Sequence, residues 1–388
     1  MIEKTEINDI YLDNASTTRP FDEVITFMGD IYKYHYANPS SLHRKGLEAE
    51  KLISEARRKI AETIGVSSTQ LVLTSGGTES NNLAIQGYLS ANKRTGNHIL
   101  CSPIEHPSVL EVVRRLQDSG YEVEYLSVNN EGEINLDSLS KTLRKSTCLV
   151  IIMLVNNETG AVQPIGKAAE IIRRSGAPAS LHVDAVQGFG KIPFNPQHDG
   201  VGTASLSAHK IHGPKGAGAI FVRDGVKIKP IVFGGGQEGT LRSGTENVAG
   251  IAGFGLAAEM VSDKMKENYD RIAALKEIFS RSLKSEIGGV VINSNANSSP
   301  YILNVSFENT KGQILHNSLE QRGVFVSTGA ACSSRKKQKS YVLEAAGVDK
   351  ELIDGTLRFS FGLFNSEDDI TVAVRILKTI VPSIRKNF

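Results

Sequence analysis

An alternation of strand-like and helix-like patterns between residues 70 and 222 most constrains the fold of this chain. Its clearest strand is Cys148–Val155, in which every residue is apolar. Such a run is typical of a strand buried on both faces, as in the centre of a parallel sheet. Further strand patterns, each followed by a helix pattern or a turn, lie at residues 70–74, 98–101, 121–128, 181–185 and 217–222. This order predicts a mostly parallel sheet covered by helices on both faces.

The pattern changes after Gly250. A long helical pattern over residues 251–284 precedes a group of strands and helices that no longer alternate. The strands are expected at 290–292, 302–307 and 357–361, and the helix at 313–322. We therefore expect an α/β protein with a large domain over residues 15–260. A smaller α+β domain would combine residues 1–14 with residues 261–388.

Composition excludes several classes of function. The 388 residues carry 44 Lys and Arg against 42 Asp and Glu, so the net charge of +2 gives no sign of a nucleic-acid or membrane surface. The longest apolar run is too short to span a bilayer, and residues 1–6 lack the apolar stretch of a secretion signal. None of the three cysteines forms a C-x-x-C pair, which argues against a disulfide framework and a zinc site. We expect a cytoplasmic protein without a metal, a membrane partner or direct nucleic-acid binding.

One lysine is well placed for chemistry. Lys210 follows a small-residue segment and precedes Gly213-Pro214, which fixes the local backbone. An amine held in a partly dry cleft has a lowered pKa and can form a Schiff base with an aldehyde. Considered alone, the pattern favours a strand that ends in a turn, with Lys210 and Lys215 both in solvent.

Other polar motifs follow strand patterns. Residues 75–81, Ser-Gly-Gly-Thr-Glu-Ser-Asn, would open a helix and could hold a phosphate at its N-terminus, although simple capping by Ser75 or Thr78 would explain them as well. Asp184, at a strand end, would face a protonated ring nitrogen or cap a helix. A metal site with His182 would lack a third ligand. His106 would stack on a planar cofactor or cap the next helix.

Together these motifs resemble those of pyridoxal-phosphate (PLP) enzymes of the class V aminotransferase family, and within it the NifS/IscS-like cysteine desulfurases. The resemblance covers nearly the whole chain, from residues 11–15 to residues 357–362. Its most specific motifs lie at residues 38–41, 75–82, 156–158, 182–185, 207–210, 242–245 and 331–332. It implies PLP-dependent transferase fold type I, with a mostly parallel seven-stranded sheet in the large domain.

The resemblance also implies a role for each matching residue. Lys210 would bind PLP covalently, Asp184 would pair with the pyridine nitrogen and His106 would stack on the ring. The other cofactor-binding residues would be Gly77, Thr78, Asn157, Gln187, Ser207, His209 and Thr245. Thr245 would reach the cofactor phosphate of a partner subunit, so a homodimer is implied. Substrate would be held by Asn38, by Asn157 and by Arg358, whose guanidinium suits a carboxylate.

The nucleophile is expected to be Cys332. Cys101 and Cys148 lie in strand patterns and read as small core residues. Cys332 lies between small residues and a polar run, which predicts an accessible thiol. With Lys210 and His106 as the other catalytic groups, it would take sulfur from L-cysteine as a persulfide and release L-alanine. A protein acceptor would pass the sulfur on to iron–sulfur clusters, thio-cofactors or tRNA.

Three other functions stay open at this point. A selenocysteine lyase and another class V aminotransferase activity would use the same fold, although an aminotransferase needs no cysteine. A sulfur-relay or scaffold protein without catalysis would not need Lys210 and Asp184, and both are present.

Overall fold

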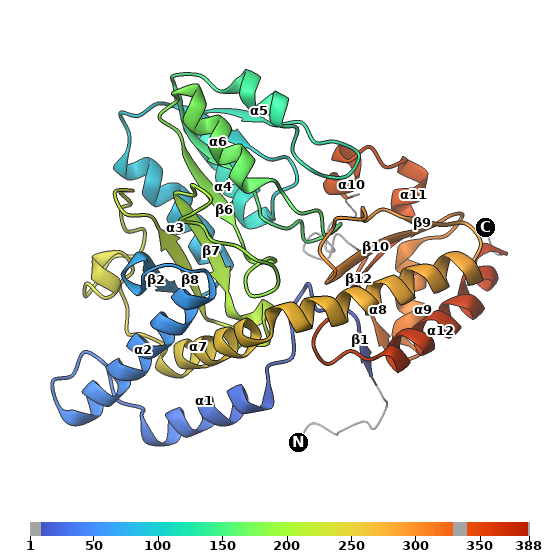
Figure 1. Ribbon diagram of the computed structural model, residues 1–388, viewed down its shortest axis with the longest axis horizontal. Coiled ribbons are helices and arrows are strands. Elements are labelled where there is room, and N and C mark those ends of the chain that lie inside the picture. Colours follow the sequence, from blue (N-terminus) through green and yellow to red (C-terminus); the bar gives the residue numbers. More distant parts are fainter. Residues whose placement is uncertain (1–8, 329–339, 387–388) are drawn as a thin grey trace.

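The computed structural model describes residues 9–328 and 340–386. Its main sheet has seven strands in the order β2-β8-β7-β6-β5-β3-β4 (Figure 1). Their bounds are β2 Leu71–Thr74, β3 His98–Cys101, β4 Glu122–Tyr125, β5 Thr147–Ile151, β6 Ser180–Asp184, β7 Thr203–Ser207 and β8 Gly218–Val222. All neighbouring pairs are parallel except the two that β8 makes. The predicted mostly parallel, seven-stranded sheet is confirmed.

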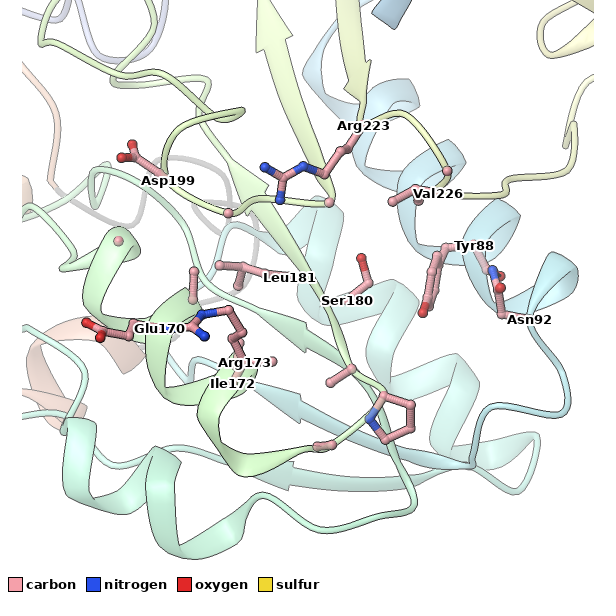
Figure 2. Close-up of a pocket in the computed structure, with 18 of the residues that line it drawn as sticks. Tyr88, Asn92, Glu170, Ile172, Arg173, Ser180, Leu181, Asp199, Arg223 and Val226 are labelled. Atoms are coloured by element: carbon pink, nitrogen blue, oxygen red, sulfur yellow. Dashed lines mark hydrogen bonds between the residues drawn. The ribbon is translucent and has the colours of Figure 1, made fainter.

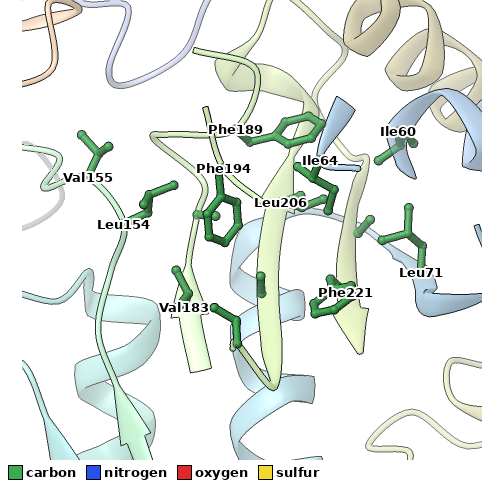
Figure 3. Close-up of a cluster of buried hydrophobic side chains, with 14 of the residues drawn as sticks. Ile60, Ile64, Leu71, Leu154, Val155, Val183, Phe189, Phe194, Leu206 and Phe221 are labelled. Atoms are coloured by element: carbon green, nitrogen blue, oxygen red, sulfur yellow. The ribbon is translucent and has the colours of Figure 1, made fainter. Parts of the chain in front are cut away.

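Helices cover both faces of this sheet. The bounds on this part of the chain are α1 Asp22–Tyr34, α2 Arg44–Thr63, α3 Gly77–Ala91, α4 Pro107–Asp118, α5 Leu136–Thr142, α6 Ile165–Ser175 and α7 Val248–Asp263. On one face, side chains of α2, α6 and α7 pack against alternate residues of the strands, and Figure 3 shows part of this core around Phe189, Leu206 and Phe221. On the other face, α3 and α4 pack against Leu149 and Ile151. Alternate residues of β5 thus enter two cores, which explains its apolar sequence.

The apolar run at residues 148–155 is not a strand over its whole length. β5 ends at Ile151, although the backbone N–H groups of Ile152 and Leu154 still donate to carbonyls of β6 at 3.1 and 2.8 Å. Beyond them the chain turns, because Asn156 Oδ1 accepts the backbone N–H groups of Glu158 and Thr159, at 2.9 Å each. This turn places Asn157 and Glu158 at the end of the sheet.

A second, smaller group of elements follows. The antiparallel strands β9 Val290–Ile292, β10 Ile302–Phe307 and β12 Thr356–Ser360 form a sheet in the order β12-β10-β9, and β1 Ile10–Tyr11 pairs with β11 Val324–Phe325. The helices are α8 Met265–Glu286, α9 Gly312–Glu320, α10 Tyr341–Ala345, α11 Lys350–Asp354 and α12 Glu367–Arg385. This is the predicted α+β arrangement. The domain limits given above stay a prediction.

The long helix predicted at residues 251–284 is in fact two. α7 and α8 meet at Lys264, whose φ of −121° and ψ of 21° leave the helical region. They follow one another along the base of the molecule and connect the two sheets (Figure 1). Phe254 of α7 packs edge-on against Phe189 in the large core, and Phe279 of α8 packs against Phe359 in the small one. Among the described residues, no helix combines the length and the apolar character needed to cross a membrane.

Candidate active site

A cavity of about 260 Å³ lies at the carboxyl ends of the parallel strands. This edge is where open α/β sheets bind ligands, because the loops that follow each strand meet there. Eight of the residues predicted for the site line the cavity: Gly77, Thr78, His106, Asn157, Asp184, Gln187, His209 and Lys210. They come from loops after five different strands, so only the folded chain brings them together.

Lys210 enters the cavity from a short turn. β7 ends at Ser207 and residues 208–210 form one turn of 3₁₀-helix, which directs the side chain back over the sheet end. Its Nζ donates to the carbonyl oxygens of Ala15 and Ser16, at 2.5 and 2.6 Å. Lys210 is half-buried, whereas Lys215 is exposed. The alternative prediction, a turn with Lys210 and Lys215 both in solvent, is therefore correct for Lys215 and wrong for Lys210.

Asp184 is held by a chain of hydrogen bonds. Its Oδ2 accepts from Asn81 Nδ2 at 2.8 Å and its Oδ1 from the backbone of Val186 at 3.0 Å. Asn81 Oδ1 faces His182 Nε2 at 3.1 Å, and His182 Nδ1 faces Thr203 Oγ1 at 2.9 Å. Burial lowers the pKa of His182 to about 4, so its ring is neutral. Both ring nitrogens are engaged, so His182 and Asp184 do not form a metal pair.

The two histidines at the cavity are also neutral. His106 Nδ1 accepts from the backbone N–H of Ser108 at 3.1 Å and caps α4, so the helix-capping alternative holds together with the position at the cavity. Burial lowers its pKa, and the nearby Lys210 adds to this while Asp184 opposes it. Burial and Lys210 also lower the pKa of His209 to about 3. A neutral ring can stack on a planar group without placing a second cation beside Lys210.

The N-terminus of α3 faces the same cavity. Gly77 packs closely, because a Cβ built on it would lie 2.6 Å from Val186 Cγ2. Thr78 lines the cavity, and the hydroxyl of Ser207 lies buried beside Gly76 without a partner among the described residues. Backbone N–H groups at a helix start and nearby hydroxyl groups favour an anion such as a phosphate.

Two amide side chains leave buried acceptors unpaired. Gln187 Nε2 donates to the carbonyl of Ala15 at 2.8 Å, while its Oε1 has no partner in the described part of the chain. Asn157 Oδ1 is likewise buried and unpaired there. Buried polar atoms are nearly always hydrogen-bonded, so these orphans indicate that the cavity is built for a polar ligand.

Arg358 approaches from the smaller part of the molecule. This β12 residue is 3% exposed, and it donates to the carbonyl of Asn157 at 2.8 Å and to Asp13 and Ser16 at 2.8 and 2.9 Å. Its Nε is buried without a partner among the described residues. The guanidinium therefore lies behind two cavity-lining residues and keeps a donor for a carboxylate.

Two of the predicted residues that the structure describes, Asn38 and Thr245, do not line this cavity. Asn38 is exposed, and its side chain accepts from the backbone of Ser40 at 2.9 Å. Thr245 is exposed in this single chain, so its predicted role across a subunit interface stays a prediction. Cys332 lies outside the described residues.

Sequence reasoning also missed residues that take part. Asn81 and Ser108 support Asp184 and His106, and Ser16 and Met153 line the cavity. Asn81 ends the Ser-Gly-Gly-Thr-Glu-Ser-Asn motif, one helical turn after Gly77 and on the same face. That spacing could have identified it, whereas Ser16 carries no local signal.

A larger hollow of about 850 Å³ lies at the opposite, amino ends of the strands. Figure 2 shows Tyr88 of α3 and Asn92 directly after it, Glu170 and Arg173 of α6, and Arg223 after β8 around this hollow. None of the residues predicted for the site lines this hollow. Within the described residues, no group of three His, Cys, Asp or Glu side chains could hold a metal there or elsewhere.

The smaller cavity fits pyridoxal phosphate. The cofactor's pyridine nitrogen calls for a carboxylate such as Asp184, and its ring for a flat neutral neighbour such as His106. Its phosphate calls for a helix start with hydroxyl groups, which α3 and Ser207 provide. The unpaired amide atoms of Asn157 and Gln187 leave polar groups for the remaining ring substituent.

Comparison with known proteins agrees with this geometry. Residues 10–372 match the model of the family Aminotransferase class-V, whose enzymes use pyridoxal phosphate. The cysteine desulfurase IscS of Dictyoglomus turgidum is 42% identical over 378 residues, which cover 97% of this chain and 95% of that protein. A solved NifS-like protein superposes with a TM-score of 0.91 at 36% identity, over 97% of this chain and all of the other. A structure described as SspA in complex with cysteine has a TM-score of 0.79 at 32% identity, over 92% and 99% of the two chains. The chain belongs to the class V aminotransferase family, in the group of the NifS- and IscS-like cysteine desulfurases.

Proposed function

We propose that the protein is a cysteine desulfurase, which removes the sulfur of L-cysteine, releases L-alanine and holds the sulfur as a persulfide on Cys332. The observation that carries this is one cavity shared by the Lys210 amine, the Asp184 carboxylate and the His106 ring. A relative named cysteine desulfurase IscS, 42% identical over almost the whole chain, supports the reaction.

The cavity residues have distinct tasks in holding the cofactor. Lys210 would bind it covalently, Asp184 would face its pyridine nitrogen, His106 its ring, and Asn157 and Gln187 its phenolic oxygen. The phosphate would be held by Gly77, Thr78, Ser207 and His209. When bound, pyridoxal phosphate supplies an aldehyde carbon and a ring that withdraws electrons from the substrate's α-carbon.

The substrate would be oriented and deprotonated by this chain's own side chains. Arg358 would hold the α-carboxylate, with Asn157 beside it and Asn38 entering from its loop. Lys210, as a free amine, would take the α-proton. His106 is neutral, so it can pass a proton at Nε2 while Nδ1 stays engaged with Ser108.

Sulfur transfer would follow as a displacement at sulfur. The Cys332 thiolate attacks Sγ of L-cysteine, the Cβ–Sγ bond breaks and a bond between the two sulfurs forms. The electron pair left on Cβ takes up a proton, which yields L-alanine. The thiolate is required because a thiol is a poor nucleophile.

The test is product analysis of the protein reconstituted with pyridoxal phosphate. We expect equal amounts of alanine and of sulfur bound to protein from L-cysteine, and no amino transfer to a keto acid. Cys332→Ala should still change the visible spectrum with L-cysteine but form no persulfide. Transfer to a keto acid in Cys332→Ala at the wild-type rate would assign an aminotransferase. Turnover of selenocysteine alone would assign a lyase.

We also propose a homodimer. Apolar side chains are exposed on α1, on α2, in the segment between these helices and near residue 233: Tyr32, Tyr36, Leu42, Leu47 and Phe233 are 63, 74, 94, 51 and 81% exposed. Large apolar side chains with this exposure are typical of an interface. Thr245, in the segment that follows Phe233, would then reach the partner's cofactor phosphate. Sedimentation of the purified protein tests the dimer.

The final acceptor would be a protein. A persulfide on a cysteine near the surface can be taken by another thiolate, such as that of a scaffold for iron–sulfur clusters or of a tRNA-thiolation enzyme. The reduced thiol chemistry fits the cytoplasm. Transfer of labelled sulfur to candidate acceptors, followed by mass spectrometry, tests the partner.

A further inference from the structure

The short helix α10 packs against Met153, which lines the active-site cavity. It starts at Tyr341, and its capping residue Ser340 directly follows residues 329–339, which include Cys332. Val342 is fully buried against Ile104 and Met153. Met153 lines the cavity, and Ile104 lies two residues before His106. α10 therefore contacts the two loops that carry cavity residues after β3 and β5.

Two consecutive residues fix this helix start by hydrogen bonds. Ser340 caps α10, since its Oγ accepts the N–H of Leu343 at 3.1 Å. The hydroxyl hydrogen is then left for Glu158, whose Oε2 accepts it at 2.5 Å. The next residue, Tyr341, donates its hydroxyl to the carbonyl of Glu105 at 2.7 Å. Glu105 precedes His106 and Glu158 follows Asn157, so each bond ends one residue from the cavity.

Burial of the Glu158 carboxyl group lowers the stability of the fold unless the group makes compensating contacts. Its side chain is 3% exposed, and burial raises its pKa to about 7, although Ser340 and the charge of Arg358 oppose the shift. A buried carboxyl group destabilises a fold unless its hydrogen bonds compensate. Here the hydrogen bond that compensates comes from the hydroxyl of Ser340, the first described residue after the segment that contains Cys332.

We propose that Glu158 is a positioning residue for sulfur transfer: through Ser340 it fixes the start of α10, and Ser340 directly follows the sequence segment that contains Cys332. This inference rests on the proposed function. The bond to Ser340 needs an acceptor and not a charge, so a glutamine should serve nearly as well as the glutamate.

The first test measures steady-state kinetics of the holoenzyme. Glu158→Ala and Ser340→Ala should each lower kcat for alanine formation about tenfold, because a displacement of 1 Å can cost more than that. KM for L-cysteine and the visible spectrum should not change, and Glu158→Gln should restore most of kcat. The double alanine variant should be no slower than either single variant, since both remove one contact.

Ser366→Ala is the matched control. Ser366 also caps a helix, since its Oγ accepts the N–H of Asp369 at the start of α12, while the Asp369 carboxylate accepts from the backbone N–H of Ser366. This cap belongs to a different helix from α10. Loss of a cap costs about 1 kcal/mol in either place. A similar loss of kcat in Ser366→Ala would show that general destabilisation explains the effect. A changed spectrum or KM in Glu158→Ala would overturn the positioning role as well.

A second readout does not depend on turnover. Cys101 and Cys148 are buried, so alkylation of the native protein by iodoacetamide reports on Cys332. Loss of the hydrogen bond between Glu158 and Ser340 should raise the alkylation rate about fivefold in Ser340→Ala and Glu158→Ala, because a lost anchoring contact favours local opening of the chain beside it. The rate should not rise in Ser366→Ala. Equal rates in all variants would refute the inference even if alanine formation is intact. Absent alanine formation with the expected alkylation pattern would instead refute the proposed function alone.

Discussion

The two edges of the main sheet differ in a way that volume does not reveal. The hollow at the amino edge measures about 850 Å³ and the cavity at the carboxyl edge about 260 Å³. Yet in the described residues, none of the buried side-chain atoms that lack a partner belongs to the lining of the larger hollow. Asn157 and Gln187 of the smaller cavity both carry one.

The difference teaches that unsatisfied polarity marks this site better than size does. At the amino edge, charged residues such as Arg173 and Lys227 are exposed and can form hydrogen bonds with water. At the carboxyl edge, an amine, a carboxylate and two neutral imidazoles are withdrawn from water around one space. Matched substitutions at the two edges test this contrast.

The largest effect is expected from the lysines. Lys210→Ala should lose the visible cofactor band and lower cysteine turnover by about 1,000-fold or more, because both binding and proton transfer depend on its amine. Lys227→Ala at the amino edge should leave both unchanged. Absorption spectra and alanine assays check the pair. Activity of Lys210→Ala close to the wild-type level would break the comparison.

Next come the aspartates. Asp184→Asn removes the negative charge but keeps the shape, so the cofactor should still bind while kcat falls about 100-fold, as for other groups that stabilise charge in a transition state. Asp199 lines the hollow at the amino edge. Asp199→Asn should change kcat by less than twofold, within the spread of surface substitutions. Steady-state kinetics measure both. Equal losses would mean that the charge of Asp184 has no special role.

A smaller effect is expected from the asparagines. Asn81→Ala removes one hydrogen bond to the Asp184 carboxylate and should lower kcat about tenfold, as expected for a bond to a charged group. Asn92 lies directly after the C-terminal end of α3, and its side-chain amide donates to the backbone carbonyls of Tyr88 and Lys227. Asn92→Ala removes these two hydrogen bonds. It should affect stability but not kcat. Kinetics together with thermal unfolding separate the two outcomes.

The last pair concerns stability rather than rate. Because burial raises the pKa of Glu158 from 4.5 to about 7, its favourable contribution is present below pH 4.5 and is lost as the pH rises to 7. Glu158→Gln removes this loss, so relative to wild type it should gain up to about 3 kcal/mol between pH 5 and pH 8. The exposed Glu170→Gln should give no such trend. Urea unfolding at several pH values measures both, and parallel curves would contradict the prediction.

Local patterns predicted the sheet and most of the cavity because strand ends and turn residues are local signals. The apolar run of β5 identified the central strand, and the acidic residue at the end of the β6 pattern identified Asp184. The contacts of Lys210 with Ala15 and Ser16 could not be predicted, since they join residues far apart in sequence through backbone carbonyls. Nor could the end of the apolar run, because burial alone does not separate strand from buried loop.

The predicted roles of Thr245, Asn38 and Cys332 are not tested by the described residues of a single chain. Thr245 and Asn38 are exposed here, so their predicted tasks require a partner subunit or a bound substrate. Cys332 was predicted from its neighbours alone and lies outside the described residues. Family resemblance, rather than a local pattern, carried the predictions for Thr245 and Asn38.

The break between α7 and α8 has a mechanical consequence. Each helix is fastened to a different core by an aromatic pair, Phe254 with Phe189 and Phe279 with Phe359. Arg358 is the neighbour of Phe359, so the packing of α8 in the small core also supports the residue whose guanidinium donates to the carbonyl of Asn157. The spacing between the two cores, which α7 and α8 bridge, thus bears on how far the guanidinium stands from the amine of Lys210.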